Sequence, residues 1–147
     1  MTSFLLQLLI LTFLFVSGTL CVEQQLVSVP KNQLDLISDV PDIPEPLRVR
    51  CLSKSNDIDV GNHTLKKGQE FNWTFGASAS GSALYSCHFY LQSKDKSFNV
   101  YDGSVRQYCG LSTTDNACIC YWCAKPDGFY ISGDKSEWKK LHSWSDS

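Results

Sequence analysis

Net charge, histidine and long helical periodicity are all scarce in this sequence of 147 residues. Thirteen basic and fifteen acidic residues leave a formal charge of −2, whereas nucleic-acid and anionic-membrane partners favour a basic face. The histidines are only His63, His88 and His142, and the chain has no G-x-S-x-G motif of the kind that hydrolases use. We therefore expect neither nucleic-acid binding nor stable membrane insertion, and we favour a binding protein over an enzyme.

The chain has one long apolar stretch, which lies at the N-terminus. Residues Phe4 to Val16 are largely apolar and are followed by the small residues Ser17, Gly18 and Thr19, which is the order of a secretory signal peptide. The stretch is short for a membrane span, which takes about 20 apolar residues. A buried core helix fits poorly, because the segment is apolar on every side. We predict a signal peptide over residues 1–21, cleaved after Gly18 or Cys21, and a secreted protein.

Cysteine is the most informative residue type in the chain. Removing Cys21 with the leader turns seven cysteines into six. An even number in an exported protein indicates disulfides. The expected disulfide cysteines are Cys51, Cys87, Cys109, Cys118, Cys120 and Cys123.

Four of these cysteines crowd around the stretch "CICYWC", which raises two other chemistries. Zinc could use Cys109, Cys118, Cys120 and Cys123, but their spacings of x8, x1 and x2 differ from paired C-x2-C knuckles. A redox C-x2-C pair at Cys120 and Cys123 lacks a surrounding thioredoxin-like βαβ pattern. We therefore predict no metal and no cofactor.

Two N-x-[ST] triplets agree with export. They are "NHT" at Asn62 and "NWT" at Asn72. Each triplet alone is weak, but together with the leader they predict a secreted glycoprotein.

The segment from 22 to 46 differs from the rest of the mature chain. It holds four prolines, several acidic residues and only short apolar groups. Prolines at 41, 44 and 46 exclude a regular helix or a central strand there. We expect a flexible, proline-rich N-terminal arm, ordered only where "QLDLI" meets a partner surface; the alternative is a processed propeptide. The folded domain is expected to span residues 47–147.

After Pro46 the sequence alternates with period two, which is typical of strands with one buried face. "LRVRC" places Arg48 and Arg50 on one face and its other residues inward, and "EFNWTF" points its aromatic residues inward and Asn72 outward. Further strands are expected in "ALYSCHFYL", "SFNVY", "CICYWCA" and "FYISG", separated by the loops "GASASGS", "SKDKS", "GLSTTDN" and "KPDG". Short strands without a long helical period predict an all-β fold, an antiparallel sandwich or barrel.

Several ordered motifs resemble the plant self-incompatibility protein homologues. "VRCLSKSNDIDVGNHTLKKGQEFNWTF" is similar to the family pattern V-x-C-x-S-K-x-x-D followed by L-x-x-G-x-x-F-x-W-x-F. "GSALYSCHFY", "SFNVYD" and "CYWCAKPDGFY" then match the later family motifs in the right order, so that the resemblance covers about Leu47 to Tyr130. The resemblance implies a small secreted β-sandwich with disulfides and no known catalytic activity.

The family pattern also suggests how the cysteines pair. Cys51 and Cys87 match its most regular cysteines, and both are inward residues of expected strands, so we expect them to form one bridge. The family-like pair Cys109 and Cys120 would leave Cys118 with Cys123. These last two cysteines are additions to the family pattern, and a cysteine common near the family's C-terminus is missing here, so the family pattern does not determine this second set of pairings.

The family's best-understood role is that of a pistil ligand that a receptor on incompatible pollen recognises. By resemblance, we expect an extracellular ligand in cell–cell recognition that binds a plant cell-surface receptor. Its specificity would lie in exposed loops, namely "SKSNDIDVGNH", "GASASGS", "SKDKS" and "GLSTTDNA". The alternative is a secreted defence protein acting on microbes or membranes, against which the slightly acidic balance argues.

Overall fold

The computed structural model describes residues 31–54, 57–76, 83–112 and 117–146. The expected signal peptide therefore lies outside the described residues. In the described part of the chain, no helix has the length and apolar character needed to cross a membrane.

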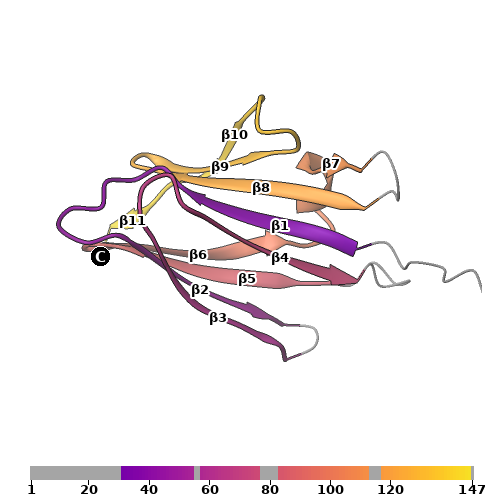
Figure 1. The fold of residues 1–147 in the computed structure, drawn as a ribbon, viewed down its shortest axis with the longest axis horizontal. Coiled ribbons are helices and arrows are strands. Elements are labelled where there is room, and N and C mark those ends of the chain that lie inside the picture. Colours follow the sequence, from indigo (N-terminus) through magenta and orange to yellow (C-terminus); the bar gives the residue numbers. More distant parts are fainter. Residues whose placement is uncertain (1–30, 55–56, 77–82, 113–116, 147) are drawn as a thin grey trace, which may run out of the picture.

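Two β-sheets face each other in a sandwich (Figure 1). One sheet, here sheet A, has the order β10 (Lys139–His142), β9 (Gly128–Ser132), β8 (Cys118–Lys125), β1 (Lys31–Ser38), β4 (Glu70–Gly76), and the short β7 (Gly110–Leu111) also pairs with β8. The other, sheet B, has the order β11 (Ser145–Asp146), β6 (Lys94–Tyr101), β5 (Tyr85–Leu91), β2 (Leu47–Ser53), β3 (Asp59–Leu65). A 3₁₀ helix, η1 (Val105–Tyr108), follows β6. The predicted all-β sandwich is confirmed.

Period-two alternation places the side chains as the sequence indicated. In β2 every second residue is buried, and Arg48 and Arg50 are exposed. In β4 the aromatic residues face inward and Asn72 is exposed. The "KPDG" segment forms the turn between β8 and β9, as expected.

The core between the sheets is rich in aromatic rings. Trp122 of β8 and Phe129 of β9 are almost fully buried, and both rings lie about 5 Å from the ring of Phe98 on β6 in sheet B (5.0 and 4.9 Å between centroids). The indole N–H of Trp122 donates a hydrogen bond of 2.8 Å to the carbonyl of Val100 on β6. One side chain thus satisfies its polar group and ties the two sheets together.

The prediction of a flexible N-terminal arm is wrong for residues 31–38. These residues form β1, which lies inside sheet A between β4 and β8 and buries Leu34 and Leu36 completely. The prolines at 30 and 41 flank β1 without entering it, so all its backbone donors remain available for the sheet. The "QLDLI" stretch does find a surface, and that surface is the chain's own sheet.

The pairing of β1 with β8 is parallel, whereas the other described strand pairs are antiparallel. A parallel neighbour must come from a distant part of the chain, because it needs a long connection. The N-terminal segment therefore closes the sheet against the late strand that carries "CICYWC" (Figure 1).

Two of the expected loops are largely strands. The "SKDKS" segment belongs mostly to β6, because Gln92, at a φ of 56°, allows a tight hairpin that ends before Lys94. The second half of "SKSNDIDVGNH" is β3, where Gly61 at a φ of 99° accompanies a register shift against β2. Polar composition predicted loops, but these exposed strands carry polar side chains on their outer face. "GASASGS" lies mostly, and "GLSTTDNA" partly, outside the described residues.

Candidate functional site

The bridge expected between Cys51 and Cys87 is present. The two cysteines are direct partners on the neighbouring strands β2 and β5, and their Cα atoms are 4.1 Å apart. They lie 36 residues apart in the sequence. Closing a loop of this length restricts the unfolded chain and stabilises the native state by about 4 kcal/mol in the chain-entropy model.

A second bridge joins Cys109, just after η1, to Cys120, the third residue of β8. Because β7 pairs with β8 through Gly110 and Ile119, the residue before β7 lies beside Cys120. The bridge thereby fastens η1 to sheet A.

The expected third bridge is absent, since Cys118 and Cys123 are both buried thiols. Both lie on β8, five positions apart, so they face opposite sides of the sheet. Five residues of strand span roughly 16 Å, and disulfide Cα atoms are usually within about 7 Å. The predicted Cys118–Cys123 pairing is therefore wrong, because two residues five positions apart on one strand cannot reach each other, whereas the pairing of Cys109 with Cys120 is confirmed.

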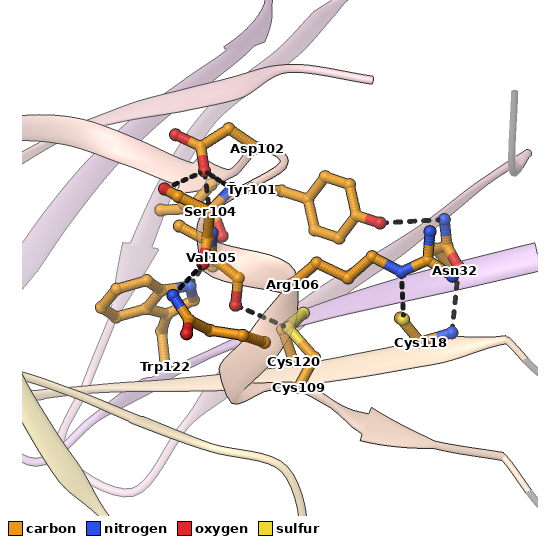
Figure 2. The surroundings of a disulfide bond; sticks show 12 residues. Asn32, Tyr101, Asp102, Ser104, Val105, Arg106, Cys109, Cys118, Cys120 and Trp122 are labelled. Carbon is orange, nitrogen blue, oxygen red and sulfur yellow. Dashed lines mark hydrogen bonds between the residues drawn. A yellow bond between two sulfur atoms is a disulfide. The ribbon is translucent and has the colours of Figure 1, made fainter. Parts of the chain in front are cut away.

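Cys118 is held by polar contacts on the inner side of sheet A (Figure 2). Arg106 of η1 donates from Nε to its Sγ at 3.2 Å, and this contact raises the pKa of Arg106. The backbone N–H of Cys118 donates to Oδ1 of Asn32 at 2.9 Å. The amide of Asn32 in turn donates to the Tyr101 hydroxyl at 3.3 Å. This hydrogen-bond network around Cys118 thus joins β1, β6, η1 and β8 without a covalent bond.

Cys123 faces the outer side of sheet A but is only 5% exposed. Burial, with a smaller contribution from the charge of Asp39, raises the pKa of this thiol to about 11, and Lys125 acts in the opposite direction. A thiol with so high a pKa is a poor nucleophile at neutral pH. Among the described residues, no group of three or more His, Cys, Asp or Glu side chains is arranged to hold a metal ion.

Asp102 shapes the turn that leads into η1. Its Oδ1 accepts hydrogen bonds from the backbone N–H groups of Ser104 and Val105 at 2.9 and 2.8 Å and from the Ser104 hydroxyl at 2.7 Å. Burial alone would raise the pKa of Asp102, but these bonds and one from Asn99 more than offset it and lower the pKa. Asp102, the last residue of the "SFNVYD" motif, therefore has a structural role, because it fixes the turn that positions Arg106.

Sequence reasoning missed the buried carboxyl group of Asp35, which belonged to the supposed arm. Asp35 is 2% exposed on the outer side of β1, and its Oδ1 has no hydrogen-bond partner in the described part of the chain. Lys135 places its Nζ 3.9 Å from Asp35 Oδ2 and 3.2 Å from Glu70 Oε2. Burial, and then the charge of Glu70, raise the pKa of Asp35 to about 6, although Lys135 acts to lower it.

The three histidines lie on three different strands, β3, β5 and β10. His88 lies on the outer face of sheet B between the Tyr90 hydroxyl, 3.0 Å from Nδ1, and the Asp95 carboxylate, 2.7 Å from Nε2. Both ring nitrogens of His88 are therefore hydrogen-bonded. His63 stacks on Phe71 with centroids 3.5 Å apart, and burial lowers the pKa of His142.

Both sequon asparagines are accessible. Asn62 on β3 and Asn72 on β4 are exposed, as are the sequon threonines Thr64 and Thr74. The asparagines point away from the core on the outer faces of the two sheets, so a glycan at either position would not disturb the packing between the sheets.

Comparisons with known proteins agree with this architecture. The family model for plant self-incompatibility protein S1 matches residues 33–144. That range begins within β1, in accord with its place inside sheet A.

Curated relatives in Arabidopsis thaliana are similar over much of the chain. S-protein homolog 5 is 34% identical over 64% of this chain and 69% of its own length, and S-protein homolog 21 is 32% identical over 83% and 87%. The match to S-protein homolog 2 is 32% identical but spans only 53% of that protein.

A solved structure of a self-incompatibility protein homologue, described as one of a widespread family of small, highly stable, secreted plant proteins, has a similar fold. The TM-score is 0.55 at 13% identity, covering 82% of this chain and 98% of the other. The extent of the family-model match, together with the sandwich fold and the relatives, shows that this chain belongs to the plant self-incompatibility protein S1 family, the S-protein homologues.

Proposed function

We propose that this protein is a secreted extracellular ligand in cell–cell recognition and that it binds a plant cell-surface receptor. Membership of the self-incompatibility family over residues 33–144 carries the proposal. The physical character of the chain supports it, since two disulfides and an aromatic core make a rigid support for an exposed recognition surface. A glycan at Asn62 or Asn72 and cleavage of a signal peptide are part of the same proposal.

The outer face of sheet B is the surface that we propose for receptor contact. Arg48 lies with its guanidinium carbon 5.4 Å from the centre of the Tyr90 ring, and Tyr90 stacks on His88 at 4.1 Å. Arg50, also exposed, pairs with Asp59 at 3.0 Å. Arginine and tyrosine dominate the energetics of many interfaces, and side chains already held in place lose less entropy on binding.

We propose binding rather than catalysis for this face. Tyr90, His88 and Asp95 form a hydrogen-bonded series that resembles a nucleophile, a general base and the carboxylate that orients the base. However, the side chains of His88 and Asp95 are 35% and 43% exposed, and the three hollows lined by Gly133, Leu52 and His142 respectively are lined by none of the three residues. A substrate held there would remain in contact with water, and enzymes usually bind substrates in a concave site.

A binding assay on plant membranes tests the proposal. The purified, oxidised protein, labelled and added to plasma-membrane vesicles from pollen or leaf, should bind saturably, and protease treatment of the vesicles should abolish the binding. Equal binding to protein-free lipid vesicles would contradict the proposal and favour the defence protein that acts on membranes. Expression in stigma or style would support a role in self-incompatibility itself, whereas expression in leaf or root would favour another signalling role.

A further inference from the structure

Two hollows adjoin each other beside the edge strand β10. One, of about 420 Å³, lies where β7, the end of β9 and the following loop meet, and Trp138 and Glu137 are among its lining residues. The other, of about 390 Å³, lies between η1 and β10, and His142 and Gln107 are among its lining residues. Tyr108 lines both hollows, which are here together called the Tyr108 groove. Each half has the size of a small-molecule site, typically about 300–1,000 Å³.

The walls of the Tyr108 groove are held firmly. Asp134 accepts hydrogen bonds from the backbone N–H groups of Ser136 and Glu137 at 2.9 and 3.1 Å and from the hydroxyls of Ser132 and Ser136 at 3.0 and 2.8 Å. These bonds hold the pKa of Asp134 far below its usual range, so the carboxylate is a fixed acceptor for the loop. The loop is also anchored to sheet A through Lys135 and Glu70.

The floor of the groove requires two glycines. A Cβ atom added to Gly110 would lie 2.1 Å from the carbonyl oxygen of Gly133, closer than real atoms approach. The backbones of β7 and of the loop after β9 can therefore meet only because both residues lack side chains. Both glycines line the larger hollow.

The side chains that line the groove include aromatic rings and polar groups without a hydrogen-bond partner among the residues that the structure describes. The indole N–H of Trp138 is used by the carbonyl of Lys135 at 3.2 Å, which fixes the ring. The Tyr108 hydroxyl, the Glu137 carboxylate and the His142 ring nitrogens make no hydrogen bond to any described residue. Burial lowers the pKa of His142, so near neutral pH the ring is uncharged and can both donate and accept.

Acidic side chains outnumber basic ones at the groove. Lys139 holds its ammonium group 4.9 Å from the centre of the Tyr108 ring, whereas Glu137 and Asp134 line the larger hollow and Asp102 lines the smaller one. Asp134 and Asp102 already accept several hydrogen bonds within their own turns, so Glu137 is the carboxylate that remains for a ligand. This lining disfavours anions and suits an uncharged, polar ligand that donates hydrogen bonds and is flat on its C–H faces. That description fits a sugar, whose C–H face packs on an aromatic ring while its hydroxyls exchange hydrogen bonds at the edges.

We propose that the Tyr108 groove binds a neutral oligosaccharide, with sugar units in its two hollows. This site is separate from the outer face of sheet B that we propose for receptor contact, so the two proposals can be tested independently. The same chemistry is offered by a cell-wall glucan and by an N-linked glycan on a partner glycoprotein.

Amide and indole chemical shifts of the ¹⁵N-labelled full mature protein test the proposal. The probes are cellohexaose and a xyloglucan heptasaccharide for the cell-wall source, a high-mannose oligosaccharide for the glycoprotein source, and a neutral Ser/Gly/Tyr peptide for comparison, each to millimolar concentration. We expect at least one saccharide to shift the Trp138 indole signal saturably. Trp122 and Trp144, whose indole N–H groups are bonded to Val100 and Lys125, serve as internal references that should not move.

Variants locate the binding. Trp138→Ala should weaken saccharide binding at least tenfold, and Glu137→Gln, an exposed and nearly isosteric change, should weaken it severalfold. Tyr130→Ala removes a tyrosine that lines neither hollow and bonds to Asp127 instead, so it should leave the affinity unchanged. The proposal is wrong if no saccharide shifts the groove signals, if Trp138→Ala binds as tightly as the wild type, or if only the peptide shifts them.

Discussion

The buried carboxyl group of Asp35 should make the stability of this protein fall as the pH rises from about 4 to 7. In the native state the pKa of Asp35 is about 6, whereas its ordinary value, expected in the unfolded chain, is 3.8. Below both values the group is protonated in both states, and its neutral form is accommodated. As the pH rises, the unfolded chain releases this proton first, so the native state loses relative stability until the pH passes 6.

The size of this loss follows from the pKa difference. A shift of about 2 pKa units corresponds to about 3 kcal/mol at roughly 1.4 kcal/mol per unit. Asp35→Asn keeps the shape of the side chain and removes its charge. The free energy of unfolding of Asp35→Asn minus that of the wild type should therefore increase by about 3 kcal/mol between pH 4 and pH 7.5.

Urea unfolding followed by tryptophan fluorescence at a series of pH values measures this difference. Other acids, such as Asp102 and Asp134, titrate in both proteins, so their contributions cancel in the difference between the two unfolding free energies. Lys135→Met supplies the matched control: removing the cation that lowers the Asp35 pKa should extend the loss of stability to higher pH. Parallel pH profiles for the wild type and Asp35→Asn would refute the reasoning.

Three further predictions concern the cysteines, the first strand and the sequons. Alkylation without reductant should leave Cys118 and Cys123 unmodified in the folded protein and label both after denaturation, and peptide mapping that finds them joined would contradict the geometry of β8. Leu34→Ala should lower the unfolding free energy by about 2–5 kcal/mol in urea titrations, because the side chain is fully buried. A loss near zero would instead support a flexible N-terminal arm. Secreted from plant cells, the protein should lose one glycan mass in each of the variants Asn62→Gln and Asn72→Gln, with little change in Tm, and unchanged masses would contradict glycosylation.

The sequence predicted the strands whose two faces differ. In β2 and β4 polar and apolar residues alternate, because one face packs on the core and the other meets water. The family motifs lie on these strands, on β5 and β6, and on β8 and β9, which is why the fold class followed from them.

β1 could not be predicted in the same way, because both its faces are covered. Asp35 points outward yet is buried under Lys135, and Asn32 points inward and is used for hydrogen bonds to Cys118 and Tyr101. Polar residues thus occupy buried positions on both sides, and the alternation disappears. The groove beside Tyr108 was equally hidden, since its walls come from η1, β7 and β10, and their proximity depends on the tertiary fold.

The central claim is that a cell-surface protein recognises this ligand through the outer face of sheet B. Competition binding on plant plasma-membrane vesicles tests it, with labelled wild type displaced by unlabelled variants. The account predicts that Arg48→Ala/Tyr90→Ala competes at least tenfold less well than the wild type, while Lys140→Ala, an exposed change on sheet A, competes equally. Equal competition by all three proteins, or binding that survives protease treatment of the vesicles, would contradict it.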